Sequence, residues 1–150
     1  MLSIRGYVHQ LDWKNICKIH NKARIFELEE SAPKEAFIPL EECYKVEKLF
    51  DSIIFVAEQN NKAVGFVAFC KQEITWLYVD PKFFRKGYGK QLLCFALSKV
   101  LKPVRVTVLK NNLRAINLYE GLGFNVEEKQ QGKIPLTNIE VTSLRMVLNA

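Results

Sequence analysis

The chain has 150 residues, of which 49% are hydrophobic, enough for one ordinary domain with a sizeable core. Its formal net charge of +6 suits a polyanionic ligand. No apolar run approaches the length of about 18 residues that a membrane span needs, and the histidines and cysteines show no metal-ligand spacing, so we expect neither a membrane protein nor a metal enzyme. There is no segregated Lys/Arg stripe and no recognition motif, so we expect no nucleic-acid partner.

The four cysteines form no Cys-x-x-Cys pair and lie in apolar patterns, so we expect most of them to be buried in a protein of the reducing cytosol. The N-terminal residues contain no long apolar segment of the signal-peptide kind, which also favours a cytoplasmic location. Cys17 and His20 would share a helix face, but no third residue is placed to orient them. Covalent catalysis by this pair is therefore not expected.

The N-terminal third is predicted to form one short strand and two helices. Residues 4–8 form the strand, and Asp12 is a suitable N-cap for a helix of roughly 15 residues that ends before Ser31. Apolar spacing predicts a buried stripe on this helix at Ile16, Ile19, Ala23 and Phe26. Pro39 suits the first position of a second helix. The inward-facing residues after it would be Tyr44, Val46, Leu49 and Phe50.

Three strands are predicted in the middle of the chain. Residues 53–57 and 63–70 flank a turn in which asparagines supply the conformations of a hairpin, Gln59–Lys62. Residues 74–79, rich in β-branched and aromatic side chains, form a buried third strand. Pro81 ends this strand because it has no N–H to give to a ladder.

The turn that follows is the most informative segment of the chain. It combines two glycines with three cations and leads into a helix: Arg85, Lys86, Gly87, Tyr88, Gly89 and Lys90. The helix would bury Leu92, Leu93, Ala96, Leu97, Val100 and Leu101. Free N–H groups and the positive end of the helix dipole would meet the cations here. We therefore predict an anion site, most naturally for phosphate.

Other interpretations of this turn differ in strength. A helix start with solvated cations needs no ligand and stays open at this point. A Walker A loop is excluded, because the glycines lack the required gap and the Gly-Lys-Ser/Thr ending. A dinucleotide fingerprint is disfavoured, because Leu92 occupies the position of its third glycine and residues 107–111 include no acidic side chain.

The remainder is predicted as strand, helix and two closing strands. These elements are strand 104–109, helix 113–122, strand 124–128 and strand 139–147. Gly123 is a natural C′ residue for the helix. The loop over residues 129–138 contains Gly132 and Pro135 and joins the last two strands.

From about Ile53 to Phe124 the chain resembles the GNAT superfamily of N-acetyltransferases. Three features carry the resemblance in the family's order. They are the strand end at 77–81, the glycine loop at 85–93, and the run Asn-Leu-Arg-Ala-Ile-Asn-Leu-Tyr-Glu-Gly-Leu-Gly-Phe at 112–124. One position departs from the family, because Phe84 stands where Arg or Gln is usual.

The resemblance implies an α/β (α+β) GNAT-like fold. Its central sheet would be mixed, mostly antiparallel and twisted, with about seven strands flanked by four helices. The sheet would be splayed at the strands ending Val79 and Leu109. Residues 1–150 would form a single GNAT N-acetyltransferase domain.

The resemblance also implies an activity. An acetyl group would pass from acetyl-CoA, a cosubstrate used without a metal, to a primary amine of an unidentified acceptor by direct attack in a ternary complex. The N-terminal helical region and loop 129–138 would border the acceptor. The positive net charge disfavours strongly cationic acceptors unless local charge reverses it. A non-catalytic acyl-CoA-binding or regulatory module is the alternative, and a homodimer is compatible with the sequence.

Two residues are the implied catalytic groups. Tyr119 would donate a proton to the departing thiolate, although it also fits a core tyrosine, and the two roles are compatible. Glu73 would take the proton of the amine, the alternatives being a solvent-facing Glu and water as the base. Because side chains alternate along a strand, we expect one face to carry Glu73, Thr75, Leu77 and Val79. The family's other base position falls on Thr107, which cannot serve.

The resemblance implies three kinds of contact to the coenzyme. The glycine loop would hold the pyrophosphate, the backbone of the preceding strand would meet the thioester and pantetheine, and the later helix would add polar contacts. The implied cofactor-binding residues are Leu77, Tyr78, Val79, Arg85, Lys86, Gly87, Tyr88, Gly89, Lys90, Asn112, Asn117 and Tyr119. Asn112 is better suited to be a helix N-cap.

Overall fold

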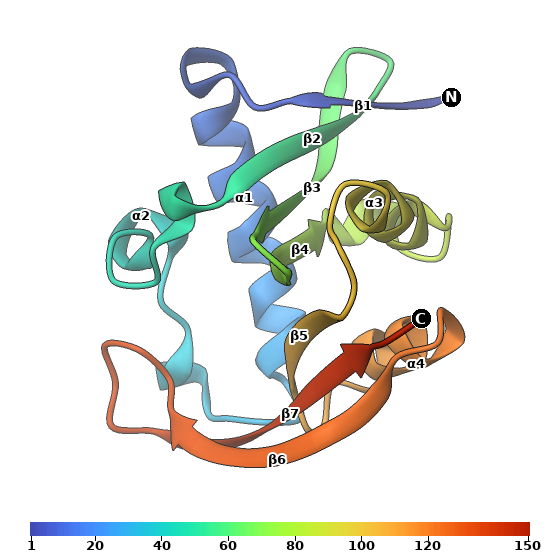
Figure 1. Ribbon diagram of the computed structural model, residues 1–150. Helices are drawn as coiled ribbons and strands as arrows, with labels where there is room; N and C mark the ends of the chain where they lie inside the picture. Colours follow the sequence, from blue (N-terminus) through green and yellow to red (C-terminus); the bar gives the residue numbers. More distant parts are fainter.

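The computed structural model describes residues 1–150 and shows one seven-stranded sheet with helices on both faces (Figure 1). The strands are β1 (Leu2–Gly6), β2 (Ile53–Gln59), β3 (Lys62–Cys70), β4 (Glu73–Val79), β5 (Val104–Leu109), β6 (Asn125–Lys133) and β7 (Glu140–Leu148). The helices are α1 (His9–Leu28), α2 (Leu40–Cys43), α3 (Tyr88–Leu97) and α4 (Leu113–Gly121). The strand order is β1-β2-β3-β4-β5-β7-β6, and only the β4–β5 pair is parallel. The predicted order of elements and the mixed, mostly antiparallel sheet are confirmed.

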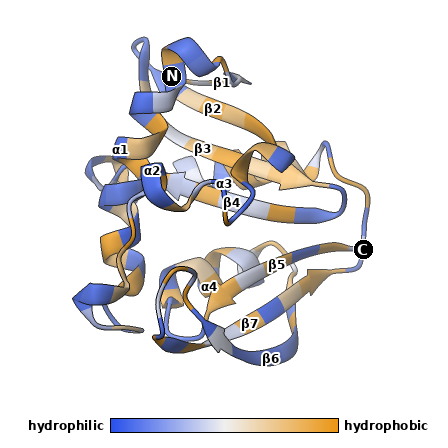
Figure 2. Ribbon diagram, turned by 90° about the vertical axis from the view of Figure 1, so that its left-hand side faces the viewer, coloured by the Kyte–Doolittle hydropathy of each residue, from blue (hydrophilic) through white to orange (hydrophobic).

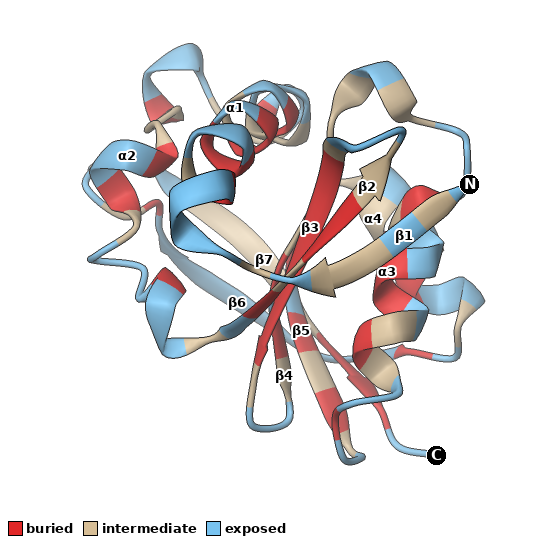
Figure 3. Cartoon of the chain, turned by 90° about the horizontal axis from the view of Figure 1, so that it is seen from above, coloured by how far each residue is buried: buried red, intermediate tan, exposed pale blue.

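Two apolar layers lie on either side of the sheet. The α1–α2 layer contains Ile16 and the α3–α4 layer contains Leu92, and both residues are fully buried. Strand β3 belongs to both layers, because successive side chains of a strand point to opposite faces: Phe66 faces α1 and Val67 faces α3. Burial is accordingly greatest in the central strands and least in β6 (Figure 3). No helix of the fold is both long enough and apolar enough to cross a lipid bilayer.

The sheet opens between β4 and β5. These strands pair only at Glu73 with Arg105 and at Ile74 with Val106, and then diverge (Figure 2). On its other edge β4 stays paired with β3, although the register shifts so that Thr75 is an extra residue. Strand β5 pairs along its whole length with β7 instead. The predicted splay is confirmed, and it leaves one edge of β4 without a strand partner.

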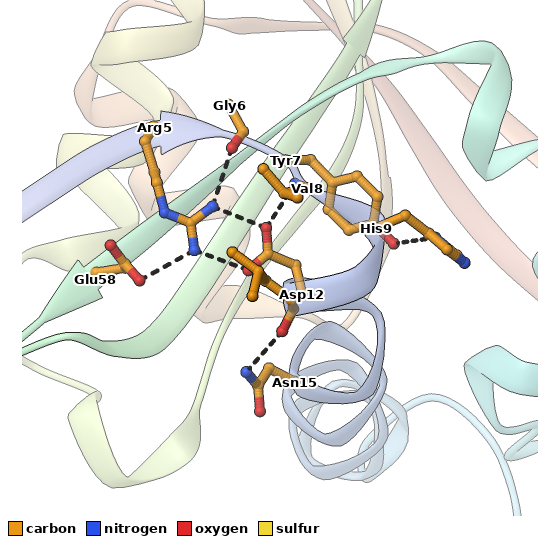
Figure 4. Close-up of polar contacts among 9 residues, drawn as sticks. Arg5, Gly6, Tyr7, Val8, His9, Asp12, Asn15 and Glu58 are labelled. Carbon is orange, nitrogen blue, oxygen red and sulfur yellow. Dashed lines mark hydrogen bonds and ion pairs between the residues drawn. The ribbon is translucent and has the colours of Figure 1, made fainter.

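The first strand is tied to the first helix by a buried carboxylate (Figure 4). Arg5 donates to both carboxylate oxygens of Asp12 at 2.8 Å and to Glu58 Oε2 at 3.0 Å. The backbone N–H of Val8 donates to Asp12 Oδ2 at 2.7 Å. Asp12 therefore lies in the first turn of α1 and is not its N-cap; the helix begins three residues earlier, at His9. The carboxylate is drawn inward by Arg5 and Val8, contacts that helical spacing does not show.

The second helix is much shorter than the sequence predicted. Pro39 is the N-cap residue and not the first helical residue, and α2 is a single turn. Lys48 has a left-handed φ of 57°, which no α-helix can include. The expected inward stripe is therefore incomplete: Leu49 is fully buried, whereas Val46 and Phe50 are 53% and 45% exposed.

Two further expectations, on the length of α3 and on the cysteines, are met only in part. Leu101 is 80% exposed because α3 ends at Leu97. Cys17 and Cys43 are buried, Cys70 is intermediate and Cys94 is exposed, so the expectation that most cysteines are buried is not met. Apolar spacing identifies a helix but does not say where it stops, which accounts for the error at Leu101.

The first of the two closing strands is longer than predicted, whereas the last has its predicted length and is shifted by one residue. Strand β6 continues to Lys133, so Gly132 belongs to a strand and pairs with Val141 of β7. Every side chain of β6 is exposed, and its sequence has no apolar alternation over the last part. Backbone pairing with β7 holds this edge strand, a long-range contact that local pattern does not indicate. The loop between the strands is thus reduced to residues 134–139.

Candidate active site

A cavity of about 520 Å³ lies where β4 and β5 diverge; we call it the cleft. Its walls are residues 74–79 of β4, 106–108 of β5, the turn before α3 and the start of α4. Residues of the second half of α1 close one side. The cleft therefore combines segments that are up to about 90 residues apart in the sequence.

The glycine turn forms the basic end of the cleft. Gly87 has a φ of 80° and is the N-cap residue of α3, a left-handed conformation that glycine adopts without strain. The first N–H groups of α3 have no carbonyl one turn earlier to bond. Arg85 and Lys90 line the cleft, whereas Lys86 does not. Free N–H groups and two cations thus meet at one end of a cavity, the arrangement of an anion site.

An aromatic stack stands beside this turn. Phe84 packs edge-on against Phe26 of α1, with ring centroids 5.7 Å apart. The guanidinium carbon of Arg114 lies 3.9 Å from the centroid of the Phe84 ring, a cation–π contact. Phe26 was predicted to be a core residue, but it is 47% exposed and lines the cleft. The family has Arg or Gln at the position of Phe84. In this chain the positive charge at that position is supplied by Arg114 of α4.

Tyr119 is both a core residue and a wall of the cleft. It is 6% exposed and packs against Phe124 with ring centroids 5.4 Å apart. Burial, together with the negative charge of Glu27, raises the pKa of Tyr119 well above its ordinary value. Asn112 also lines the cleft, and its Oδ1 accepts from the Ala115 N–H at 3.3 Å, so it is the N-cap of α4. Asn117 is exposed on α4 and does not line the cleft.

Comparison with known proteins gives the family. The family model for the acetyltransferase (GNAT) domain matches residues 50–126, about half of the chain. The chain belongs to the GNAT acetyltransferase family. It is therefore an acyltransferase, and the match covers the strand end, the glycine loop and the run 112–124 on which the resemblance was based.

Individual relatives of this GNAT enzyme match over most of their length, and the solved ones agree in fold. The uncharacterised N-acetyltransferase YafP of Escherichia coli K12 is 26% identical over 133 residues, which cover 87% of this chain and 85% of that protein. PaiA N-acetyltransferase from Thermoplasma acidophilum, solved in complex with coenzyme A, has a TM-score of 0.81 at 20% identity, covering 100% of this chain and 99% of that one. The acetyltransferase YncA of Salmonella typhimurium, solved with acetyl-CoA, has a TM-score of 0.71 at 20% identity, covering 99% and 94%.

The face of β4 that carries Glu73 was predicted wrongly. The register shift at Thr75 breaks simple alternation, so Ile74 packs in the same layer as Leu77 and Val79, and Glu73 belongs to the opposite face. Glu73 does not line the cleft of this GNAT enzyme, and its Oε1 accepts from Arg145 Nη2 at 3.0 Å. Its carboxylate is therefore held by Arg145 outside the cavity where the amine would react.

Sequence reasoning missed a second carboxylate. Glu27 lines the cleft, and its Oε1 accepts from the Tyr78 hydroxyl at 2.8 Å and from Arg24 Nη1. Burial, with the charge of Glu27, raises the pKa of Tyr78 well above its ordinary value. The only signal in the sequence was the spacing of Arg24 and Glu27, which is common on solvated helices.

The other candidate groups of this GNAT enzyme do not form a reactive centre. Burial raises the pKa of the Cys17 thiol to about 12 and lowers the pKa of His20. His20 Nδ1 is hydrogen-bonded to Asn21 Oδ1 at 2.9 Å and not to the thiol. No three His, Cys, Asp or Glu side chains gather in a way that could hold a metal ion. Residues 129–138 were expected to border the acceptor, but none of them lines the cleft. Only Gln131 borders a smaller polar pocket beside it.

Proposed function

We propose that this enzyme transfers an acetyl group from acetyl-CoA to a primary amine by direct attack in a ternary complex, with residues 1–150 acting as one domain. The observation that supports this most is the cleft itself. One cavity joins the basic turn at the start of α3 to the unpaired edge of β4 and to Tyr119. The coenzyme A and acetyl-CoA bound to PaiA and YncA support the choice of donor.

The donor would bind along the splay. Its pyrophosphate would accept hydrogen bonds from the free N–H groups of Tyr88, Gly89 and Lys90, next to the cations of the turn. Arg114 would add a third positive charge at the cleft wall, because its contact with Phe84 holds it there. The pantetheine would run along residues 77–79, whose outward N–H groups have no strand partner.

The chemistry has three parts: attack on the thioester carbonyl, collapse of the oxyanion and transfer of a proton. The nitrogen lone pair of the neutral amine attacks the thioester carbonyl carbon, a C–N bond forms, and the carbonyl oxygen becomes an oxyanion. Backbone N–H groups of β4 would stabilise this oxyanion without any cost of ordering side chains. As the oxyanion collapses, the C–S bond breaks, the thiolate leaves, and a proton from the former amine nitrogen neutralises it.

Tyr119 would help the thiolate leave as a hydrogen-bond donor. A phenol whose pKa is raised far above that of a thiol, about 8.5, stays protonated and transfers its proton only uphill. Its hydrogen bond to the sulfur nevertheless stabilises the developing charge. Among the contacts to the coenzyme, Asn112 would serve from its capping position, while Asn117 and Lys86 would reach the coenzyme only outside the cleft.

The ammonium form of the acceptor must lose a proton before attack. We propose that water in the open cleft takes this proton, because Glu73 lies outside the cleft and is paired with Arg145. With an amine pKa near 10.4, only a small fraction of the acceptor is neutral at pH 7, so the rate should rise with pH.

The test is thiol release from acetyl-CoA in the presence of a panel of primary amines. Release that requires both enzyme and amine, with the acetylated amine detected by mass spectrometry, supports the proposal. Tight binding of acetyl-CoA without release on any amine would favour the non-catalytic acyl-CoA-binding module instead.

A further inference from the structure

One wall of the cleft is acidic, and it comes from the C-terminal end of α1 and the two residues that follow it. Glu27, Glu29 and Glu30 line the same cavity as the cations of the glycine turn. Glu29 and Glu30 are exposed, whereas Glu27 is partly buried, with 22% of its side chain accessible. The cleft thus carries opposite charges on different walls, and Glu27 is the acidic group that is fixed in place.

Three elements hold the Glu27 carboxylate. Tyr78 of β4 and Arg24 of α1 both donate to Oε1, and the Asn112 amide at the start of α4 donates to Oε2 at 3.5 Å. A carboxylate can accept about four hydrogen bonds, two on each oxygen. Oε1 already has two short bonds, while Oε2 has only this long one. Oε2 therefore keeps acceptor capacity inside a cavity where a ligand is expected.

The charge around Glu27 favours a cation. Arg24 is the one cation in contact with it, and the negative charge of Glu47 also acts on Arg24. Arg24 is thus under the influence of two carboxylates, and the exposed Glu29 and Glu30 add further negative charge to the cleft. Tyr78, the remaining close neighbour, is a neutral phenol, because burial raises its pKa.

We propose that Glu27 is the binding residue for the ammonium group of the acceptor, and that the acceptor is an alkylammonium cation that enters along α1. This rests on the proposed acetyl transfer. Glu27 and Tyr119 line the same cavity, so an ammonium on Oε2 would share the cleft with the phenol that we place at the sulfur. Near the cleft, attraction by the local acidic wall outweighs the repulsion of a cation by the net charge of +6 on the whole chain.

The experiment measures equilibrium binding of the putrescine dication by titration calorimetry to protein saturated with coenzyme A. Glu27→Gln should weaken binding roughly 10- to 100-fold, the range for losing one charged hydrogen bond. Glu42→Gln is the matched control, because Glu42 is exposed on α2, outside the cleft, and its loss changes the net charge equally. It should bind like the wild type. Neutral butanediol should not bind measurably to any variant.

Kinetics and a conservative variant separate binding from folding. If putrescine is acetylated, Glu27→Gln should raise its KM with little change in kcat, and Glu27→Asp should recover part of the affinity. Acetyl-CoA affinity should be the same in all variants. Equal putrescine affinity in Glu27→Gln and wild type, or wild type that binds acetyl-CoA but not putrescine, overturns the ammonium site and leaves the proposed reaction standing. Wild type that does not bind acetyl-CoA contradicts the proposed function itself.

Discussion

Substituting Asp12 by Asn tests the link between β1 and α1. The Asp12 carboxylate is 1% exposed and accepts two bonds from Arg5 at 2.8 Å and one from Val8 at 2.7 Å. Removing one partner of a buried ion pair costs about 3–5 kcal/mol. Because the Arg5 side chain is 33% exposed and partly solvated, we discount this to about 2–4 kcal/mol. For a chain of this length that corresponds to a fall in Tm of roughly 5–15 °C.

The assay is urea unfolding of wild type and Asp12→Asn at several pH values, with Asp51→Asn as an exposed control that should change little. Hydrogen bonds from Arg5 lower the pKa of Asp12 below its ordinary value of 3.8. The stabilisation is therefore complete above that value and is lost as the pH falls through the lower pKa of the folded state. A stability difference under 1 kcal/mol at pH 7, or one that does not shrink in acid, would refute this reasoning.

Three further predictions concern the cleft. Tyr119→Phe should lower kcat roughly 10- to 100-fold with acetyl-CoA affinity unchanged, because one hydrogen bond to the leaving sulfur is lost; an unchanged kcat in steady-state assays would remove the residue from the mechanism. Glu73→Gln should leave the pH–rate profile where it is, since the carboxylate lies outside the cleft, and a shift of that profile toward alkaline pH would restore it as the base. Gly65→Ala should cost about 1–3 kcal/mol in urea unfolding and weaken acetyl-CoA binding, because an added Cβ would lie 2.8 Å from the carbonyl oxygen of Tyr78. Gly6→Ala, with no atom within 4 Å of its added Cβ, is the control, and equal losses in both variants would argue against a steric effect on β4.

Features set by local chemistry were predictable from the sequence. Asn60 and Asn61 both adopt positive φ in the β2–β3 hairpin, as a two-residue turn requires. Gly123 has a φ of 100° after α4, and Gly87 begins α3 in the left-handed conformation. In each case a few neighbouring residues determine the backbone, so the strand, turn and helix around the anion site could be located without a structure.

Features set by distant contacts were not predictable. The face of Glu73 depends on a register shift opposite Ala68, which no alternation pattern in β4 reveals. Glu27 enters the cleft only because α1 crosses the open end of the splay, where Tyr78 and Asn112 reach it. The basic end of the cleft was therefore located largely from one contiguous segment, whereas its acidic wall required the structure.

The most direct test of the account is thermal unfolding with and without acetyl-CoA in three proteins: wild type, Gly89→Glu and Gly121→Glu. An added Cβ at Gly89 would make only ordinary contacts, the nearest at 3.7 Å, so the variant should fold while its carboxylate repels the pyrophosphate in the cleft. Gly121 is exposed at the end of α4, so its variant carries the same charge outside the site. Acetyl-CoA at about 100 times its Kd should stabilise wild type and Gly121→Glu by about 2.7 kcal/mol and leave Gly89→Glu unchanged. Equal stabilisation of all three proteins, or of none, would contradict the claim that the glycine turn binds the coenzyme.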